Sequence, residues 1–451
     1  MVVRAPADPG SGLSEVEAQT LSNLLEDVLE GFGNCAVSRA ETLPDAEAWN
    51  EPVPEGLVIR LHPRKVGGLL ALDYELASPD RIQRRQPMLW RTMTPTAPVE
   101  AYRNVIQGLP VELLDTRLEA LIPEKPEAFW LLLTALGSAP TPQALAAAEL
   151  ARQQAHGCAG PDFVLGHLHY QRAGLPSAKL EDLQRAQQHF QEAMRITANY
   201  PSGLYDLTRL QSDTGSAQAA LEMTLKLRKS RPHGRALLGA VAYSARFSGM
   251  LDLAVRAHAR AHALEINPKA PPRLQLALFY QGDLMGFERS LYLRPGSYSN
   301  NLVQFYMGRL AMHRGETARA IAHLEEGENG SGGSPKVARL CRSFRLILQG
   351  QSSQARIDLE RVRADLGAAL VPDGELTLSV AEAYLLMGEP DSSMDLVEQS
   401  VQQGFQCTPW FEQNPMLAPL RETPRWQKLH RYLLDQQARV YAKFPGTDWG
   451  L

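Results

Sequence analysis

The sequence predicts a mainly α protein in which an α-solenoid of repeated helical hairpins follows a small α/β domain. From about residue 127 to residue 435, helical segments come in pairs, and small residues recur with a period near 34 residues. Before residue 110, apolar residues alternate instead with a period of two, which is typical of strands. We therefore divide the chain into an α/β domain (1–110), a connector (111–126), a repeat array (127–435) and a C-terminal tail (436–451).

The first 110 residues predict the order strand, helix, strand, hairpin and helix. A short strand begins at Val2, and Ser14 forms a capping box with Glu17 for a helix that ends at Gly31. Alternating apolar residues on both sides of a Gly-Gly turn at 67–68 predict a β-hairpin. The remaining predicted elements are strands within 35–39 and 88–93 and a closing helix at 98–108.

The repeat array contains about seven predicted helical pairs. Residues 271–295 fit the pattern poorly and predict a shortened or irregular pair, and two overlapping glycine-rich stretches, 328–334 and 327–333, predict a surface loop. The seven pairs are expected at 127–136 with 143–156, 163–173 with 180–196, 203–212 with 217–230, 235–247 with 251–266, 298–314 with 317–326, 336–349 with 354–365, and 375–387 with 392–403.

Small residues at the expected helix crossings have a physical cause. Packed helices lie about 8–10 Å apart, which leaves no room for large side chains at the point of contact. Gly166, Gly308 and Ala381 permit this approach, and aromatic residues such as Phe190 and Tyr384 fill the space beside them. We expect the array to bury these residues between hairpins and to leave a concave face for partners.

This pattern resembles the tetratricopeptide-repeat family over residues 125–435. The copies that support the resemblance are Gly308, Gly315 and Ala320; Ala381, Tyr384 and Gly388; and Ala186, Phe190, Ala193 and Pro201. The resemblance implies a protein that binds partners and carries out no chemistry.

A second resemblance concerns bacterial signalling proteins. Residues 404–429 resemble the segment that closes the repeat arrays of winged-helix regulators, adenylate cyclases and Ser/Thr kinases. Residues 1–110 resemble the amino-terminal domain of the TolB protein in element order and size, with Trp90 where that family has a Trp late in the sheet. The phosphate loop, kinase lysine motif and cyclase aspartates of such relatives are absent from the sequence. The resemblance therefore implies the sensing or docking half of a signalling protein.

Composition narrows the class of protein further. The chain has 44% hydrophobic and 21% charged residues and a formal net charge of −4, which provides no overall field for a polyanion. We therefore expect no nucleic acid partner. No run approaches 18 apolar residues and no apolar signal segment is present, so we expect no membrane segment and a cytoplasmic protein. The four cysteines, Cys35, Cys158, Cys341 and Cys407, contain no Cys-x-x-Cys pair, which favours a reducing compartment.

Candidate chemical sites are weak in this sequence. His258 and His262 lie four apart on a predicted helix, but Ala259 stands where a zinc protease needs Glu, so packing or a solvent-facing position is favoured. His167 and His169 are expected to point in different directions on their helix. The basic cluster at 81–85 is expected to be a solubilising surface. We predict no catalytic, cofactor-binding or metal-binding residues.

The strongest binding prediction comes from the repeat geometry. Aligning the units on Gly215, Gly249 and Gly315 places aromatic and arginine residues at positions that commonly line a concave groove. Such residues suit a peptide with an acidic group, because a guanidinium pairs with a carboxylate while a ring supplies contact area. The alternative, that several of them pack between repeats, stays open. The six residues are Tyr205, Arg209, Tyr243, Arg246, Phe305 and Arg309.

The sequence thus predicts a non-enzymatic scaffold of a bacterial regulatory or assembly pathway. On this hypothesis, replacing Arg209 or Arg246 with Ala weakens partner binding without lowering the melting temperature. Two alternatives remain: the regulatory half of a transcriptional or signalling regulator, and a small-ligand sensor or enzyme with a pocket near residues 57–95.

Overall fold

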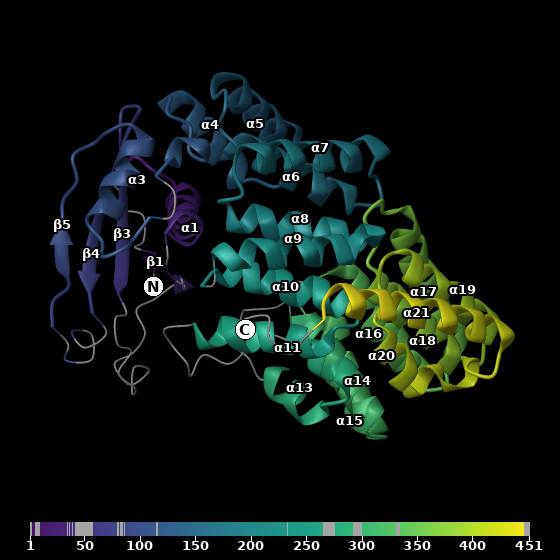
Figure 1. Ribbon diagram of the computed structural model, residues 1–451. Coiled ribbons are helices and arrows are strands. Elements are labelled where there is room, and N and C mark those ends of the chain that lie inside the picture. The colour runs from purple at the N-terminus through teal and green to yellow at the C-terminus, as the bar shows by residue number, and fades with distance from the viewer. Residues whose placement is uncertain are drawn as a thin grey trace.

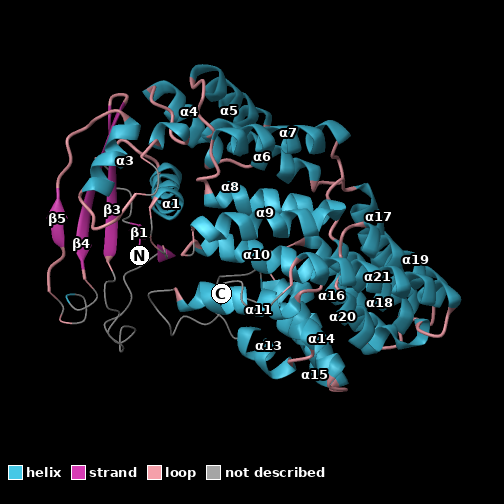
Figure 2. Cartoon of the chain, in the orientation of Figure 1, coloured by secondary structure: helices cyan, strands magenta, loops and turns pink. Residues whose placement is uncertain are grey.

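The computed structural model shows a mainly helical protein with a small sheet near the N-terminus (Figures 1 and 2). This confirms the predicted class at the level of helix and sheet content. The structure describes residues 2–4, 10–33, 35, 37, 39–40, 57–78, 81, 84, 86–113, 116–231, 233–264, 276–291, 300–330 and 334–445. Parts of several predicted segments lie outside these residues, namely 36, 38, 82, 83, 85, 114–115, 265–266, 271–275, 292–295, 298–299, 331–333 and 446–451.

The sheet has the strand order β2-β1-β3-β4-β5. β1 pairs in parallel with β2 and β3, whereas β3, β4 and β5 pair antiparallel. The predicted hairpin is present: its register runs from Val58 opposite Ala77 to Val66 opposite Leu69, and Gly67 supplies the positive φ that the tight turn needs. The strands are β1 (Val2–Arg4), β2 (Arg39–Ala40), β3 (Val58–Val66), β4 (Leu69–Ala77) and β5 (Leu89–Arg91).

Two helices, α1 (Glu15–Phe32) and α3 (Pro98–Gln107), cover one face of the sheet (Figure 1). The capping box of α1 is present, with Ser14 and Glu17 bonded reciprocally. The hydroxyl of Tyr102 on α3 donates a 2.9 Å hydrogen bond to the carbonyl of Leu21 on α1. The apolar cluster between sheet and helices continues into Phe163 and neighbouring residues of the repeats, so the α/β part shares a core with the first hairpins.

The rest of the described chain is a series of helices in which each packs against its neighbours in sequence. A 3₁₀ helix η2 (Leu118–Ala120) precedes this series, and the π-type segment η3 (Ser212–Ser216) and the 3₁₀ helix η4 (Pro415–Leu420) lie within it. The helices are α4 (Pro126–Leu136), α5 (Pro142–Gln154), α6 (Gly160–Ala173), α7 (Leu180–Ile196), α8 (Pro201–Gln211), α9 (Ala217–Ser230), α10 (Arg235–Phe247), α11 (Leu251–Ala263), α12 (Leu276–Gln281), α13 (Leu284–Leu291), α14 (Asn300–His313), α15 (Thr317–Asn329), α16 (Pro335–Leu348), α17 (Ser352–Ala368), α18 (Gly374–Leu386), α19 (Pro390–Gln402), α20 (Thr408–Gln413) and α21 (Pro424–Lys443).

Two sets of glycines recur along the helical pairs, one at the helix crossings and one at the turns. A Cβ at Gly166 would lie 2.8 Å from the Phe190 ring, and one at Gly308 would lie 2.7 Å from Leu324, so these positions allow the close helix approach that the sequence predicts. A second set, at the turns of the hairpins from α8/α9 to α18/α19, has positive φ at intervals of roughly 34 residues. This set is Gly215, Gly249, Gly282, Gly315, Gly350 and Gly388.

Two predicted boundaries are wrong. The predicted loop at 327–334 begins too early, because α15 runs on to Asn329 and Gly327 is helical. Gly327 is needed there, since a Cβ would lie 2.6 Å from the sulfur of Cys341. The predicted tail also begins too early, because α21 continues to Lys443.

The C-terminal helices return to the middle of the chain. The amide of Gln406 donates a 2.9 Å hydrogen bond to the carbonyl of Phe247, and Lys443 forms a 2.7 Å ion pair with Glu222 on α9. A Cβ at Gly404 would lie 2.3 Å from the carbonyl oxygen of Ser212. One apolar cluster extends from Ala217 to Phe444, so the C-terminal helices fill space that an open array would leave accessible.

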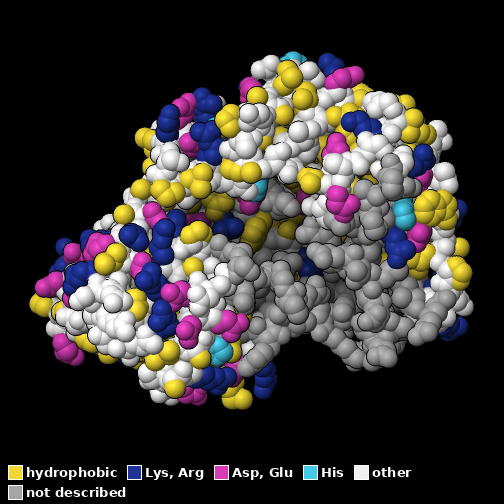
Figure 3. All heavy atoms as spheres, turned by 180° about the vertical axis from the view of Figure 1, so that it is seen from behind, with side chains coloured by type: hydrophobic (Ala, Val, Ile, Leu, Met, Phe, Trp, Pro, Cys, Tyr) yellow, Lys and Arg dark blue, Asp and Glu magenta, His cyan; other side chains and the backbone are white. Residues whose placement is uncertain are grey.

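The surface is mixed in charge. Figure 3 shows Lys and Arg side chains interspersed with Asp and Glu side chains over the described surface of one face. Among the described helices, none combines the length and apolar character needed to cross a bilayer.

Candidate functional site

Three of the predicted residues form what we call the arginine row: Arg209 on α8, Arg246 on α10 and Arg309 on α14. Each guanidinium lies over aromatic rings. The guanidinium carbon of Arg209 is 5.9 Å from the ring centre of Tyr170 and 5.6 Å from that of Tyr243, and Arg246 is 4.8 Å from Tyr243. Arg309 is 5.3 Å from the ring of Phe279. Cation–π contact of this kind is worth about 0.5–2 kcal/mol, more when the pair is desolvated.

Arg246 is paired with an acid of the chain's own α18. Its Nη2 lies 2.8 Å from Oε2 of Glu375, and Tyr280 on α12 donates a 2.8 Å hydrogen bond to Oε1 of the same carboxylate. The side chains of Arg246 and Glu375 are only 9% and 10% exposed. Burial raises the pKa of Glu375, and the charge of Arg246 opposes that rise. This carboxylate therefore receives a guanidinium and a phenol together.

Arg309 is paired more deeply. Its Nη2 lies 2.5 Å from Oε2 of Glu382, and Nη1 donates to the hydroxyl of Ser379 at 3.2 Å. Asn414 donates a 2.6 Å hydrogen bond to the other oxygen of Glu382. The two charged side chains are 2% and 0% exposed. The pair is thus a fully desolvated, hydrogen-bonded part of the core.

These contacts correct the expectation of an open groove along all six predicted residues. Arg246, Phe305 and Arg309 are buried, and Phe305 packs against Phe344 on α16 with ring centres 5.8 Å apart. The groove positions of α10 and α14 face α18 because the chain returns on itself. For these three residues, packing between repeats describes the structure.

The Arg209 end of the row differs. Arg209, Tyr205 and Tyr243 are only half-buried. Both neighbouring arginines have an acid from α18, whereas Arg209 has no ion pair with any described residue. Its Nε is buried and has no hydrogen-bond acceptor among the described groups, which is also true of the Nε atoms of Arg246 and Arg309, so the difference lies in the ion pairs alone. A cavity of about 170 Å³ lies between α1, α6 and α8, and His167 and Asp206 line it one helical turn before Tyr170 and Arg209.

Asp213 links the aromatic rings on either side of Arg209. It lies in η3, and its two oxygens accept hydrogen bonds from Tyr170 at 3.0 Å and Tyr243 at 2.7 Å. Burial raises the pKa of Asp213 to about 7, although the Tyr243 hydrogen bond and the charge of Arg209 lower it. Two tyrosines thus hold a carboxylate that is partly protonated near neutral pH, so Asp213 neutralises Arg209 only in part.

The sequence analysis missed the acids that close the row. Glu375 and Glu382 lie seven residues apart on α18, on an otherwise largely apolar helix. Seven residues span two helical turns, so the two carboxylates share one face. Two acids on one face of such a helix predict that buried basic residues pair with them. The sequence does not predict which basic residues these are.

The other sequence candidates lie apart from the row. His167 bonds to Asp206 at 2.5 Å and His169 to Asp182 at 3.1 Å, so the two histidines point in different directions as expected. His258 and His262 lie half-buried on α11. Within the described ranges, no group of three His, Cys, Asp or Glu residues could hold a metal ion. Burial raises the pKa of Cys35 to about 11 and that of Cys158 to about 12, which disfavours a reactive thiolate at either position.

Comparison with known proteins adds no relative. No protein-family model matches this chain, and no curated protein is significantly similar to it. The tetratricopeptide and TolB-like resemblances therefore remain predictions, and the functional argument depends on the geometry of the arginine row.

Proposed function

We propose that this protein is a non-enzymatic interaction platform, in which a tetratricopeptide-type solenoid binds an acidic peptide of a partner protein at the Arg209 end of the arginine row. The difference in occupancy along the row supports this proposal. Arg246 and Arg309 each hold a glutamate of α18, whereas Arg209 lies between two aromatic rings and has no such partner among the described residues. A guanidinium in this setting binds a carboxylate through two parallel N–H donors.

The internal pairs indicate how a partner would bind. At Arg246, a guanidinium and the Tyr280 phenol share one carboxylate. Arg209 and Tyr205 provide the same two side-chain types in the half-buried part of the row. We expect a partner's Asp, Glu or terminal carboxylate to be received in the same way, with the rings of Tyr205 and Tyr243 supplying contact area.

A regulatory or assembly role follows from the resemblance to repeat-containing signalling proteins. The rival proposal, a ligand site in the α/β part near residues 57–95, has less support. Three cavities lined by described residues lie between α5, α6 and α7 and between α1, α6 and α8, and residues 57–95 line none of these three.

A peptide-display screen on the full chain tests the proposal. The best binder is then measured by fluorescence anisotropy against the parent protein, Arg209→Gln and Tyr205→Ala. Arg195→Gln is the matched control, because Arg195 lies on α7 outside the arginine row, is 71% exposed and is paired with Glu192. We expect peptides enriched in acidic residues and at least tenfold weaker binding to Arg209→Gln, with Arg195→Gln unchanged.

Equal affinity of Arg209→Gln and the parent would contradict the proposal, as would peptides without acidic residues. Arg246→Ala is unsuitable as a probe. Because Arg246 neutralises a buried glutamate, we now expect its loss to lower the melting temperature, contrary to the expectation from the sequence.

A further inference from the structure

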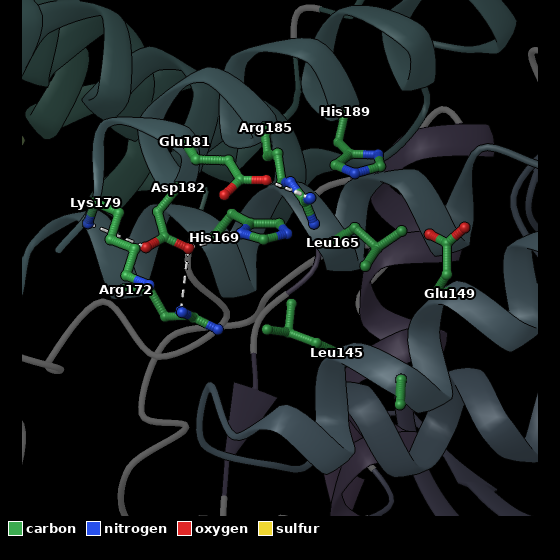
Figure 4. A pocket seen from close by; sticks show the side chains of 11 residues that line it. Leu145, Glu149, Leu165, His169, Arg172, Lys179, Glu181, Asp182, Arg185 and His189 are labelled. Carbon is green, nitrogen blue, oxygen red and sulfur yellow. Dashed lines mark hydrogen bonds and ion pairs between the residues drawn. The ribbon is translucent and has the colours of Figure 1, made fainter.

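A polar cleft lies between α5 and α7, above α6 (Figure 4). It consists of a part of about 330 Å³ and a larger part of about 790 Å³, and Glu149, Arg185 and His189 line both parts. Leu145 and Leu165 line the smaller part. The arginine row plays no part in this cleft, so the inference below is independent of the proposed function.

Two histidines in this cleft are each hydrogen-bonded to an aspartate on the opposite helix of the α6–α7 hairpin. We call this arrangement the exchange. Nδ1 of His169 on α6 lies 3.1 Å from Oδ1 of Asp182 on α7, and Nδ1 of His189 on α7 lies 2.8 Å from Oδ1 of Asp162 on α6. Both aspartates are 4% exposed. Asp182 also accepts hydrogen bonds from the amide of Lys179 and ion-pairs with Arg172, so it is held in place as a carboxylate.

The exchange sets which ring nitrogens face the cleft. A carboxylate only accepts, so each Nδ1 carries the proton and each Nε2 keeps its lone pair. Because α6 and α7 form a hairpin, Asp182 lies near the turn and Asp162 near the open end. The two Nδ1 atoms therefore point toward opposite ends of the hairpin, and the two Nε2 atoms point toward each other. Figure 4 shows both rings beside the same part of the cleft, with Glu149 across it on α5.

The separation of the rings fits a shared metal ion. Their centres are 5.9 Å apart and their planes differ by 6°. With Zn–N bonds of about 2.0–2.1 Å, two imidazoles on one tetrahedral to linear ion have ring centres about 5–6.5 Å apart. Nearly parallel planes allow both lone pairs to lie in one plane with the ion. A carboxylate on the far nitrogen of each ring is also the usual support of a metal-binding histidine.

We propose that Nε2 of His169 and Nε2 of His189 bind one borderline divalent cation of the Zn²⁺ class, with Asp182 and Asp162 as positioning residues. No third residue completes a three-ligand group within the described chain, so the other coordination positions belong to water or to a group that swings in. Glu149 lines both parts of the cleft and could supply such a group, since its exposed pair with Arg152 is worth little and can open.

Titration of the chelator-treated full chain with ZnCl₂ alone, by isothermal calorimetry, tests this site. We expect one ion per chain and at least tenfold weaker binding to His169→Gln and to His189→Gln. Asp162→Asn should weaken binding about tenfold or more through loss of ring orientation. Co²⁺ absorption gives a second readout, in which the d–d bands of the parent are lost in both histidine variants.

The matched control is the double variant His258→Gln with His262→Gln, a helical i,i+4 pair that provides the competing chelate. We expect this variant to bind Zn²⁺ like the parent. Circular dichroism without metal checks folding, and if His169→Gln does not fold, the less buried His189→Gln decides the question. Absence of binding to the parent, or a loss that follows His258 and His262 only, would overturn the proposal.

Discussion

Arg309 and Arg209 occupy the same place in the repeat and have opposite surroundings. Each precedes the turn glycine of its hairpin by six residues (309 to 315 and 209 to 215), and each lies over aromatic rings. Arg309 is 2% exposed and paired with a glutamate that lies 73 residues later in the chain. Arg209 is half-buried and has no such pair among the described residues. Residue type and repeat position are therefore the same for a core residue and for a candidate binding residue.

The difference shows how arginines at the predicted groove positions come to be buried. A guanidinium flanked by aromatic rings suits a carboxylate wherever it occurs. Along α10 and α14 the carboxylate comes from α18 of the same chain, and the pairs are desolvated because α20 and η4 close over them. At α8 no described acid returns. We therefore expect the two ends to respond oppositely to substitution, in stability at one end and in binding at the other.

The largest effect is expected for Glu382→Ala, which tests the buried end of the arginine row. This change leaves the guanidinium of Arg309 buried without its carboxylate and removes the acceptor of Asn414. We expect a loss of about 3–5 kcal/mol in the free energy of unfolding, measured by urea denaturation.

A double variant serves as the control for this experiment. Replacing the pair with apolar residues, Arg309→Met with Glu382→Leu, removes both charges at similar volume and should cost clearly less than Glu382→Ala alone. If Glu382→Ala unfolds at the same urea concentration as the parent, the closed end of the row is not desolvated as described.

The next effect concerns pH and Asp213, which links the two aromatic rings beside Arg209. The pKa of Asp213 is about 7 in the folded chain, against an ordinary value of 3.8. Between about pH 4 and 7, the folded state therefore keeps a proton that the unfolded state has released. Stability from this group is therefore fully present below about pH 4 and is lost as pH rises to about 7, by about 2–4 kcal/mol.

We expect Asp213→Asn to reduce the fall in urea midpoint between pH 5 and pH 8, because an amide does not ionise. The exposed Asp391→Asn, in the first turn of α19, should leave that fall unchanged. An equal pH dependence in the parent and in Asp213→Asn would show that this carboxylate ionises normally.

The smallest effect is expected at the open end. Arg209→Gln removes a half-buried cation–π contact and a charge that lowers the pKa of Asp213, but it leaves the two tyrosine hydrogen bonds of that carboxylate in place, so its cost should be about 0.5–1 kcal/mol, several times less than that of Glu382→Ala. Thermal unfolding of both variants under one condition gives this ratio. A loss at Arg209 as large as that at Glu382 would remove the distinction between the two ends.

Local structure was largely predictable from the sequence. The predicted helices at 217–230 and 235–247 match α9 and α10 at both ends, and the hairpin around Gly67 has the predicted turn. The described part of the irregular stretch at 271–295, namely residues 276–291, contains two short helices, as the poor fit to the repeat indicated. These features depend on neighbours a few residues apart, through helical periodicity, capping and turn glycines.

Long-range contacts were not predictable in the same way. The sequence indicated that arginines at the groove positions suit an acid, but it did not show that α18 supplies two. It also missed the exchange between His169 and His189, because their aspartates lie on the opposite helix of the hairpin.

The sequence by itself determined where helices, strands and turns lie and which side-chain chemistry each hairpin presents, because periodicity and glycine positions act over one hairpin. Only the tertiary structure decided that Arg246 and Arg309 are core while Arg209 stays half-exposed. That outcome depends on a helix more than 70 residues away returning to the row. Burial is a property of the whole chain's path, and no local pattern specifies it.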